Sequence, residues 1–224
     1  MQTETYKNLF GPSLSYFTSE YKSLSEKQQN NIDCIVNTAS SLIVTYRSKG
    51  IGINSRVVGD LMRQGAFAEN SLFLKYLAGI SVSSHTDEMQ SDQGSYYINF
   101  LQQISSYQVT IHKLIYAKLR KIFADTKTER SNWQTTISIA EVLQQLQIKP
   151  DKSYRGLIKH IFKGLQRLVL IREAKFAQDF MQQGVQIRAS GIGVELYLWA
   201  QGRGDLSRDS LKYLIDTSVL LENF

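Results

Sequence analysis

Apolar residues recur at spacings of three and four along much of this chain, and this period constrains its fold more than any other feature of the sequence. Only two prolines, Pro12 and Pro150, are present to interrupt helices. The period is clearest at Ile32, Ile35, Val36, Ala39, Leu42, Ile43 and Tyr46. A chain of 224 residues, 42% of them hydrophobic, can bury a core in one large domain or in two smaller ones. We therefore predict a mainly α fold.

The second half of the chain interleaves helical segments with short stretches typical of β-strands. Residues 134–138 and 169–171 are rich in β-branched side chains, and residues 185–188 alternate between apolar and polar. From residue 106 the predicted order is helix, strand, helix, turn, helix, strand, loop, strand and helix, which is the order of a winged helix. We predict an N-terminal helical region over residues 1–104. A winged-helix-like α+β module with a small β-hairpin and C-terminal helices follows over residues 105–224.

The basic charge of the chain is concentrated in one segment, residues 113–175. This segment holds 14 Lys and Arg against 5 Asp and Glu, whereas the first 112 residues hold 8 against 9 and the last 49 hold 4 against 6. The whole chain carries a formal net charge of +6. Cations gathered on one segment are typical of a surface that contacts a polyanion.

The densest part of this segment is the predicted third helix of the module, residues 154–168. Its cations recur every four residues, so they form one row on the side of the helix opposite its apolar stripe. In a winged helix the third helix is offered to a groove of DNA and the hairpin forms the wing. The predicted nucleic-acid-binding residues are Lys152, Arg155, Lys159, Lys163, Arg167, Arg172, Lys175 and Arg188.

Three interpretations of this row stay open on the sequence alone. The cations can neutralise nucleic-acid phosphates, contact a protein or another anionic surface, or form an ordinary solvated face. No acidic residue lies between Lys152 and Arg172, which favours a polyanion over plain solvation. Base-specific reading requires suitable side chains at the start of the helix, where only Tyr154 and Arg155 qualify.

Motifs that would indicate an enzyme, a cofactor or a metal site are missing from the sequence. Residues 50–54 are glycine-rich, but the Gly-Lys-Ser/Thr of a phosphate-binding loop does not follow them. The three histidines, His85, His112 and His160, show no ligand spacing with Cys34, the single cysteine. No nucleophile is paired with a base in a recognisable motif. We therefore expect a non-enzymatic protein without cofactor or metal.

The sequence also bears on the location and the partners of the protein. The N-terminal residues do not form a signal peptide, and no window approaches 18 consecutive apolar residues, so we expect a cytoplasmic protein without a membrane span. Duplex DNA or another nucleic acid is the expected partner. A protein partner or a homo-oligomer is left open.

Short motifs along residues 29–200 resemble those of the bacterial abortive-infection alpha (Abi-alpha) family. That family has a similar succession of helices, a polar gap, and a β-hairpin followed by Thr-x-x-Gly and a last helix; here Ala189 stands in place of the usual threonine, and Ile104 precedes Ser105 where leucine is usual. The resemblance implies a role in defence against phage and carries over no catalytic residue. The matching segments are residues 31–35, Ala39, and residues 50–56, 73–80, 97–105 and 185–196.

Two hypotheses about function follow from these observations. The first is nucleic-acid binding by the basic module, in transcriptional regulation or in phage defence. The alternative is a module for protein–protein interaction or assembly within a defence system. A small-molecule sensor in the N-terminal helices is a third hypothesis, for which the sequence offers no test.

Overall fold

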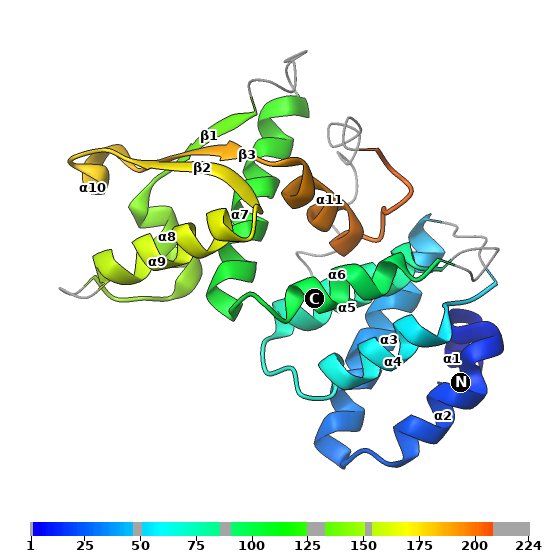
Figure 1. Cartoon of the computed structure of the whole chain (residues 1–224). Helices are drawn as coiled ribbons and strands as arrows, with labels where there is room; N and C mark the ends of the chain where they lie inside the picture. Colours follow the sequence, from blue (N-terminus) through cyan, green and yellow to red (C-terminus); the bar gives the residue numbers. More distant parts are fainter. Residues whose placement is uncertain (1, 47–50, 86–90, 125–132, 151–153, 208–224) are drawn as a thin grey trace. The chain divides into compact units, whose positions relative to one another are not determined.

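The structure of the chain is a computed structural model that describes residues 2–46, 51–85, 91–124, 133–150 and 154–207 (Figure 1). The chain divides into two compact units. Unit 1 comprises Met1–Gln103 and Leu198–Asp205, and unit 2 comprises Ile104–Tyr197 and Leu206–Phe224. Each unit is described by itself.

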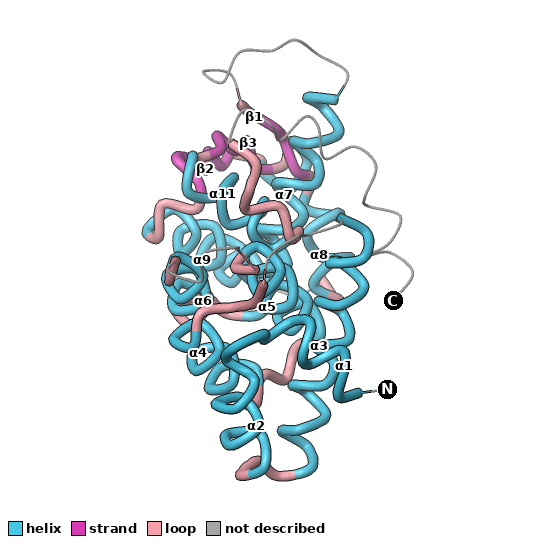
Figure 2. The backbone as a smooth tube through the Cα atoms, turned by 90° about the vertical axis from the view of Figure 1, so that its right-hand side faces the viewer, coloured by secondary structure: helices cyan, strands magenta, loops and turns pink. Residues whose placement is uncertain are grey.

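The elements that the structure describes in unit 1 are all helical, as Figure 2 shows by its colouring. Long apolar side chains that recur every three or four residues on α3 and α5 are fully buried, which is why these two helices pack along each other. The side chains of Asn54 and Asn70 cap the first turns of α4 and α5. The elements are α1 Gln2–Phe10, the 3-10 turn η1 Gly11–Ser13, α2 Leu14–Lys22, α3 Glu26–Tyr46, α4 Ser55–Gly65, α5 Ser71–Ser83 and α6 Gln93–Leu101.

The segment Leu198–Asp205 belongs to unit 1, whereas the sequence-based division assigns it to the second module. Contacts far apart in the sequence explain the difference. The Ser83 hydroxyl donates a hydrogen bond to the Trp199 carbonyl at 2.9 Å, and the Trp199 ring stacks on Tyr97 with centroids 4.6 Å apart. A Cβ added at Gly79 would lie 1.9 Å from the Ala200 carbonyl oxygen, so only glycine allows this approach.

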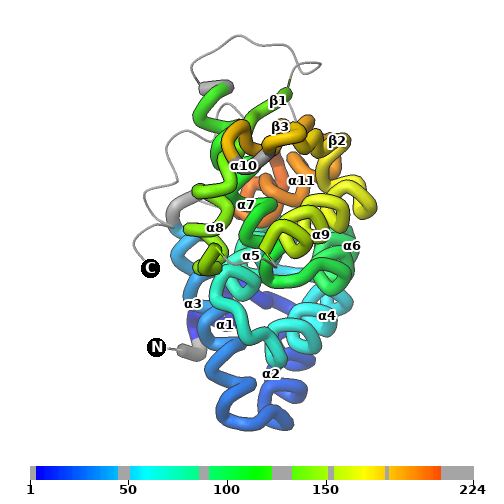
Figure 3. Tube along the Cα trace, turned by 90° about the vertical axis from the view of Figure 1, so that its left-hand side faces the viewer, coloured from blue at the N-terminus to red at the C-terminus, as the bar shows by residue number. Residues whose placement is uncertain are grey.

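Unit 2 has the element order of a winged helix, as the sequence predicts, so the predicted fold class is confirmed. Two antiparallel pairings join its strands in the order β1-β3-β2, which makes a three-stranded sheet of which the predicted hairpin is one part. Figures 1 and 3 show α8 and α9 on the same side of this sheet. The elements are α7 Ser106–Ala124, β1 Gln134–Ile137, α8 Ile139–Leu146, α9 Tyr154–Arg167, β2 Ile171–Phe176, α10 Phe180–Gln183, β3 Val185–Ala189 and α11 Gly191–Ala200, of which the last three residues belong to unit 1.

The two faces of the sheet differ in exposure. Val185, Ile187 and Ala189 of the central strand β3 are buried, while Gln186 and Arg188 alternate with them and point to the other face. The buried face therefore meets the core that α7, α8 and α9 line. Of the predicted C-terminal helices, α11 is described, and residues 208–224 lie outside the described residues.

Candidate nucleic-acid interface

The helix α9 presents four cations to solvent. Its buried face carries apolar side chains, whereas all four cations of the predicted row are exposed. This outcome follows from the helical period, because steps of three and four keep the apolar positions on one side. We call Arg155, Lys159, Lys163 and Arg167 the α9 row.

Close packing against α7 holds the helix in this orientation. A Cβ added at Gly164 would lie 1.9 Å from the side-chain nitrogen of Gln108 on α7, so any larger residue would displace the Gln108 side chain. The Gln108 side-chain oxygen in turn accepts a hydrogen bond from the Ser105 amide at 2.7 Å. Because α9 is pressed against α7 and β2 on one side, the α9 row faces away from the core.

The row crosses the exposed face of α9 obliquely. Steps of four residues advance about 6 Å along an α-helix and turn about 40° beyond a full rotation, so the row spans about 18 Å. The α9 sequence contains no Asp or Glu. Among the described residues, no ion pair involves Arg155, Lys163 or Arg167. The local field on this side of unit 2 is therefore positive.

One wing cation continues the row. Arg172 is exposed at the start of β2, and the Gln166 side-chain amide donates to the Arg172 carbonyl at 3.4 Å. That contact brings the backbone at Arg172 next to the last turn of α9. The backbone of Arg172 therefore lies close to the end of the α9 row, and its side chain is exposed.

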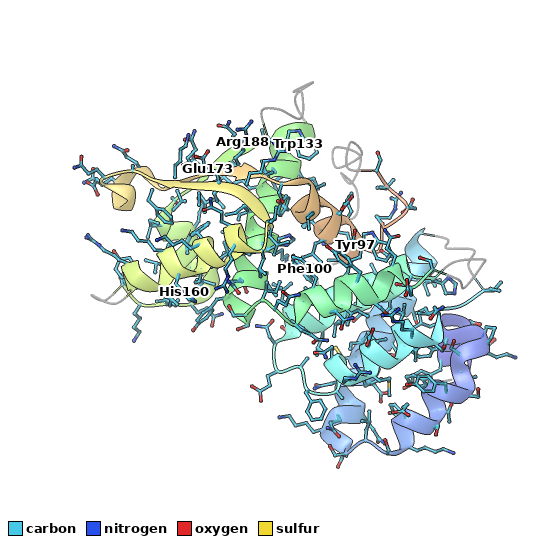
Figure 4. The ribbon with its side chains drawn as sticks, viewed as in Figure 1. Tyr97, Phe100, Trp133, His160, Glu173 and Arg188 are labelled. Carbon is cyan, nitrogen blue, oxygen red and sulfur yellow. The ribbon has the colours of Figure 1, made fainter. Side chains whose placement is uncertain are left out.

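Two other predicted site residues, Lys175 and Arg188, lie on a different face of unit 2 from the α9 row. Lys175 pairs with Glu173 at 3.4 Å, and Glu173 stands opposite Arg188 in the sheet register. Arg188 is on the face of β3 that points away from the core, and Figure 4 shows it beside Glu173, on the opposite side of unit 2 from His160 of α9. A flat partner cannot touch both sides of the sheet at once.

The structure also bears on the remaining sequence-based assignments, those of Tyr154 and the hairpin tip, but not on Lys152. Lys152 lies outside the described residues. Tyr154, one of the two residues that the sequence allowed as a reader of bases, is only 8% exposed and packs into the core, so it is not available for that role. The hairpin tip, residues 177–184, contains Asp179 but no Lys or Arg. The tip of the wing therefore supplies no cation to a nucleic acid.

Sequence reasoning missed two unusual positions at the ends of α9. Gly156 is exposed, and a Cβ added there would meet no described atom within 4 Å. Val169, which follows the helix, is 50% exposed and has a left-handed φ of 57°. The isolated glycine within a helical pattern can be recognised from the sequence, whereas the left-handed conformation of Val169 is seen only in the structure.

The buried titratable groups of unit 2 have structural roles. The His112 ring is fully buried, and its Nε2 atom lies 3.0 Å from the Gly193 carbonyl oxygen. Burial lowers the pKa of His112 to about 3, so the ring is neutral. Burial likewise raises the pKa of Tyr116 to about 12, and its hydroxyl donates to the Leu170 carbonyl. Neither group is accessible to a substrate.

Unit 1 contains a small groove along α6, lined by Tyr96, Asn99 and Phe100, with the Arg56–Asp92 ion pair at its rim. Within the described ranges, no three His, Cys, Asp or Glu side chains converge as metal ligands would. Nor does any described helix combine the length and the apolar character that crossing a bilayer requires.

Comparisons of the chain with protein families, with characterised proteins and with solved structures found no match.

Proposed function

We propose that this chain is a non-enzymatic protein that binds duplex DNA through the α9 row and Arg172. One observation carries the proposal: four cations of one helix are exposed together while the opposite face of that helix is locked into the core. Lys and Arg in such a row can contact successive phosphates and release their counterions. The winged-helix order of unit 2 supports the same use of its third helix.

The exposed face of α9 favours contacts to phosphates over the reading of bases. Adenine is commonly read by Asn or Gln through paired hydrogen bonds. The face contains no Asn, and the side-chain amide of Gln166, its only Gln, already donates to a backbone carbonyl. Tyr154 is buried. Arg155 is then the one exposed residue at the start of the helix that can read a base, through a guanine. We therefore propose that binding is largely independent of base sequence and that the duplex is held through its backbone.

The salt dependence of binding gives the sharpest test. Five phosphate contacts, four from the α9 row and one from Arg172, predict a slope of about −4.5 in a plot of log affinity against log salt concentration, or roughly a 500-fold loss between 50 and 200 mM salt. Binding of the full chain to a fluorescent duplex, followed by anisotropy at several salt concentrations, measures this slope. No binding at 50 mM salt would contradict the proposal.

Matched substitutions locate the surface. Lys159→Gln and Lys163→Gln together should weaken binding and reduce the slope by about 2, because two phosphate contacts are lost. Lys175→Gln removes one charge from the far side of the sheet and should change affinity little. If Lys175→Gln weakens binding as much as Lys163→Gln alone, the overall charge and not the α9 row is responsible.

The role in phage defence that the Abi-alpha resemblance implies stays a prediction. The geometry of the α9 row suits a nucleic acid in defence and in transcriptional regulation alike. The alternative, a protein partner, would use the same surface. It would be supported if the chain binds a protein but does not bind duplex DNA.

A further inference from the structure

Within the described part of unit 2, no contact of Gly156 requires a glycine. It lies in the first turns of α9, on the exposed face, and a Cβ added there would meet no described atom within 4 Å. Alanine is the better helix former, because glycine loses more backbone freedom on folding. Gly164 on the same helix differs, because the Gln108 side chain occupies the space that a side chain at position 164 would need.

The surroundings of Gly156 indicate what the bare position admits. Arg155 precedes it, Lys159 follows one turn later, and His160 lies beside Lys159 on the same exposed face. Residues three and four apart are neighbours on a helix, so Lys159 and His160 border Gly156, while Arg155 lies one turn before Lys159 in the α9 row. Glycine typically marks a place where another backbone approaches a chain closely.

From this juxtaposition we infer that the sugar–phosphate backbone of the bound nucleic acid packs directly against α9 at Gly156. The inference rests on the proposed function and extends it: the cations of the α9 row attract the strand, and Gly156 sets how near it comes. Arg155 and Lys159 then contact phosphates on either side of the position where the strand touches the helix. The contact is one of shape and adds no sequence preference.

Substitution of Gly156 separates this inference from the effect of charge. Gly156→Ala should raise the melting temperature by about 2 °C through helix propensity. The same substitution should weaken duplex binding about tenfold, because the added methyl group keeps the strand from its place. Gly156→Leu should weaken binding further. The slope against salt should stay that of the wild type, since every cation remains.

Gln144, exposed on α8, offers the matched control. Gln144→Ala and Gln144→Leu change side-chain size on the same unit and should leave affinity unchanged. Wild-type affinity in Gly156→Ala, with the steep salt dependence intact, overturns the close contact and leaves the proposed function standing. A weaker affinity with a lower salt slope also overturns it, because the effect would then come from displaced cations. No binding by the wild type overturns both.

Discussion

His112 makes the stability of unit 2 depend on pH, and the sign and size of the effect follow from its burial. The ring lies in the core of unit 2, with Nε2 at 3.0 Å from the Gly193 carbonyl and the Tyr116 ring at a centroid distance of 4.7 Å. Burial lowers the pKa of His112 to about 3, and the hydrogen bond to Gly193 offsets this only in part. In the unfolded chain the pKa returns to about 6.5.

These two pKa values set the pH window. Below about pH 6.5 the unfolded chain binds a proton that the folded chain does not, so the free energy of unfolding decreases as the pH falls towards 3. Each pH unit within the window corresponds to about 1.4 kcal/mol. Between pH 7.5 and pH 5.0 the loss due to His112 is therefore about 2 kcal/mol. This is a large fraction of the 5–15 kcal/mol that is typical of a folded domain.

Urea denaturation at pH 7.5, 6.0 and 5.0, followed by circular dichroism, measures this loss. His112→Gln keeps a donor for the Gly193 carbonyl but cannot titrate, so it should lose about 2 kcal/mol less than the wild type over the same range. His160→Gln removes an exposed histidine from α9 and should behave as the wild type. The reasoning is refuted if His112→Gln and the wild type lose the same free energy between pH 7.5 and pH 5.0.

Three further substitutions test how α8, α9 and α11 are held. Val169→Gly should raise the free energy of unfolding by about 1 kcal/mol in thermal melts, since glycine adopts the left-handed φ of 57° without strain. Gln147→Gly, at a φ of 53° after α8, should raise it for the same reason. A loss of stability in Val169→Gly would show instead that the valine side chain contributes packing. Gly193→Ala should destabilise unit 2 by about 3 kcal/mol in urea, because the new methyl group would lie 2.0 Å from the Tyr116 hydroxyl and 2.1 Å from the Leu170 carbonyl oxygen. Wild-type stability in Gly193→Ala would contradict the tight packing of α11 on α7.

The α9 helix could be predicted from the sequence almost to the residue. The predicted range was 154–168 and the observed one is Tyr154–Arg167. Val169 was expected in a strand, yet it closes the helix: its amide donates to the Gln166 carbonyl and the Leu170 amide donates to Leu165. The strand β2 therefore starts later, at Ile171. A β-branched residue in a left-handed turn contradicts local propensity, so the sequence pattern could not indicate it.

The sequence by itself determined the mainly α fold, the order of elements in unit 2 and the exposure of the α9 row, because helical period and strand alternation are local properties. Only the tertiary structure decided that β3 pairs with both β1 and β2, and that Leu198–Asp205 joins unit 1. It also showed that the predicted basic residues lie on two different faces of unit 2. In the sequence, Lys175 and Arg188 belong to the same group of predicted binding cations as the α9 row. The register of the sheet places them on the face that points away from α9, next to Glu173. Strand register depends on hydrogen bonds between distant segments, and no local pattern records it.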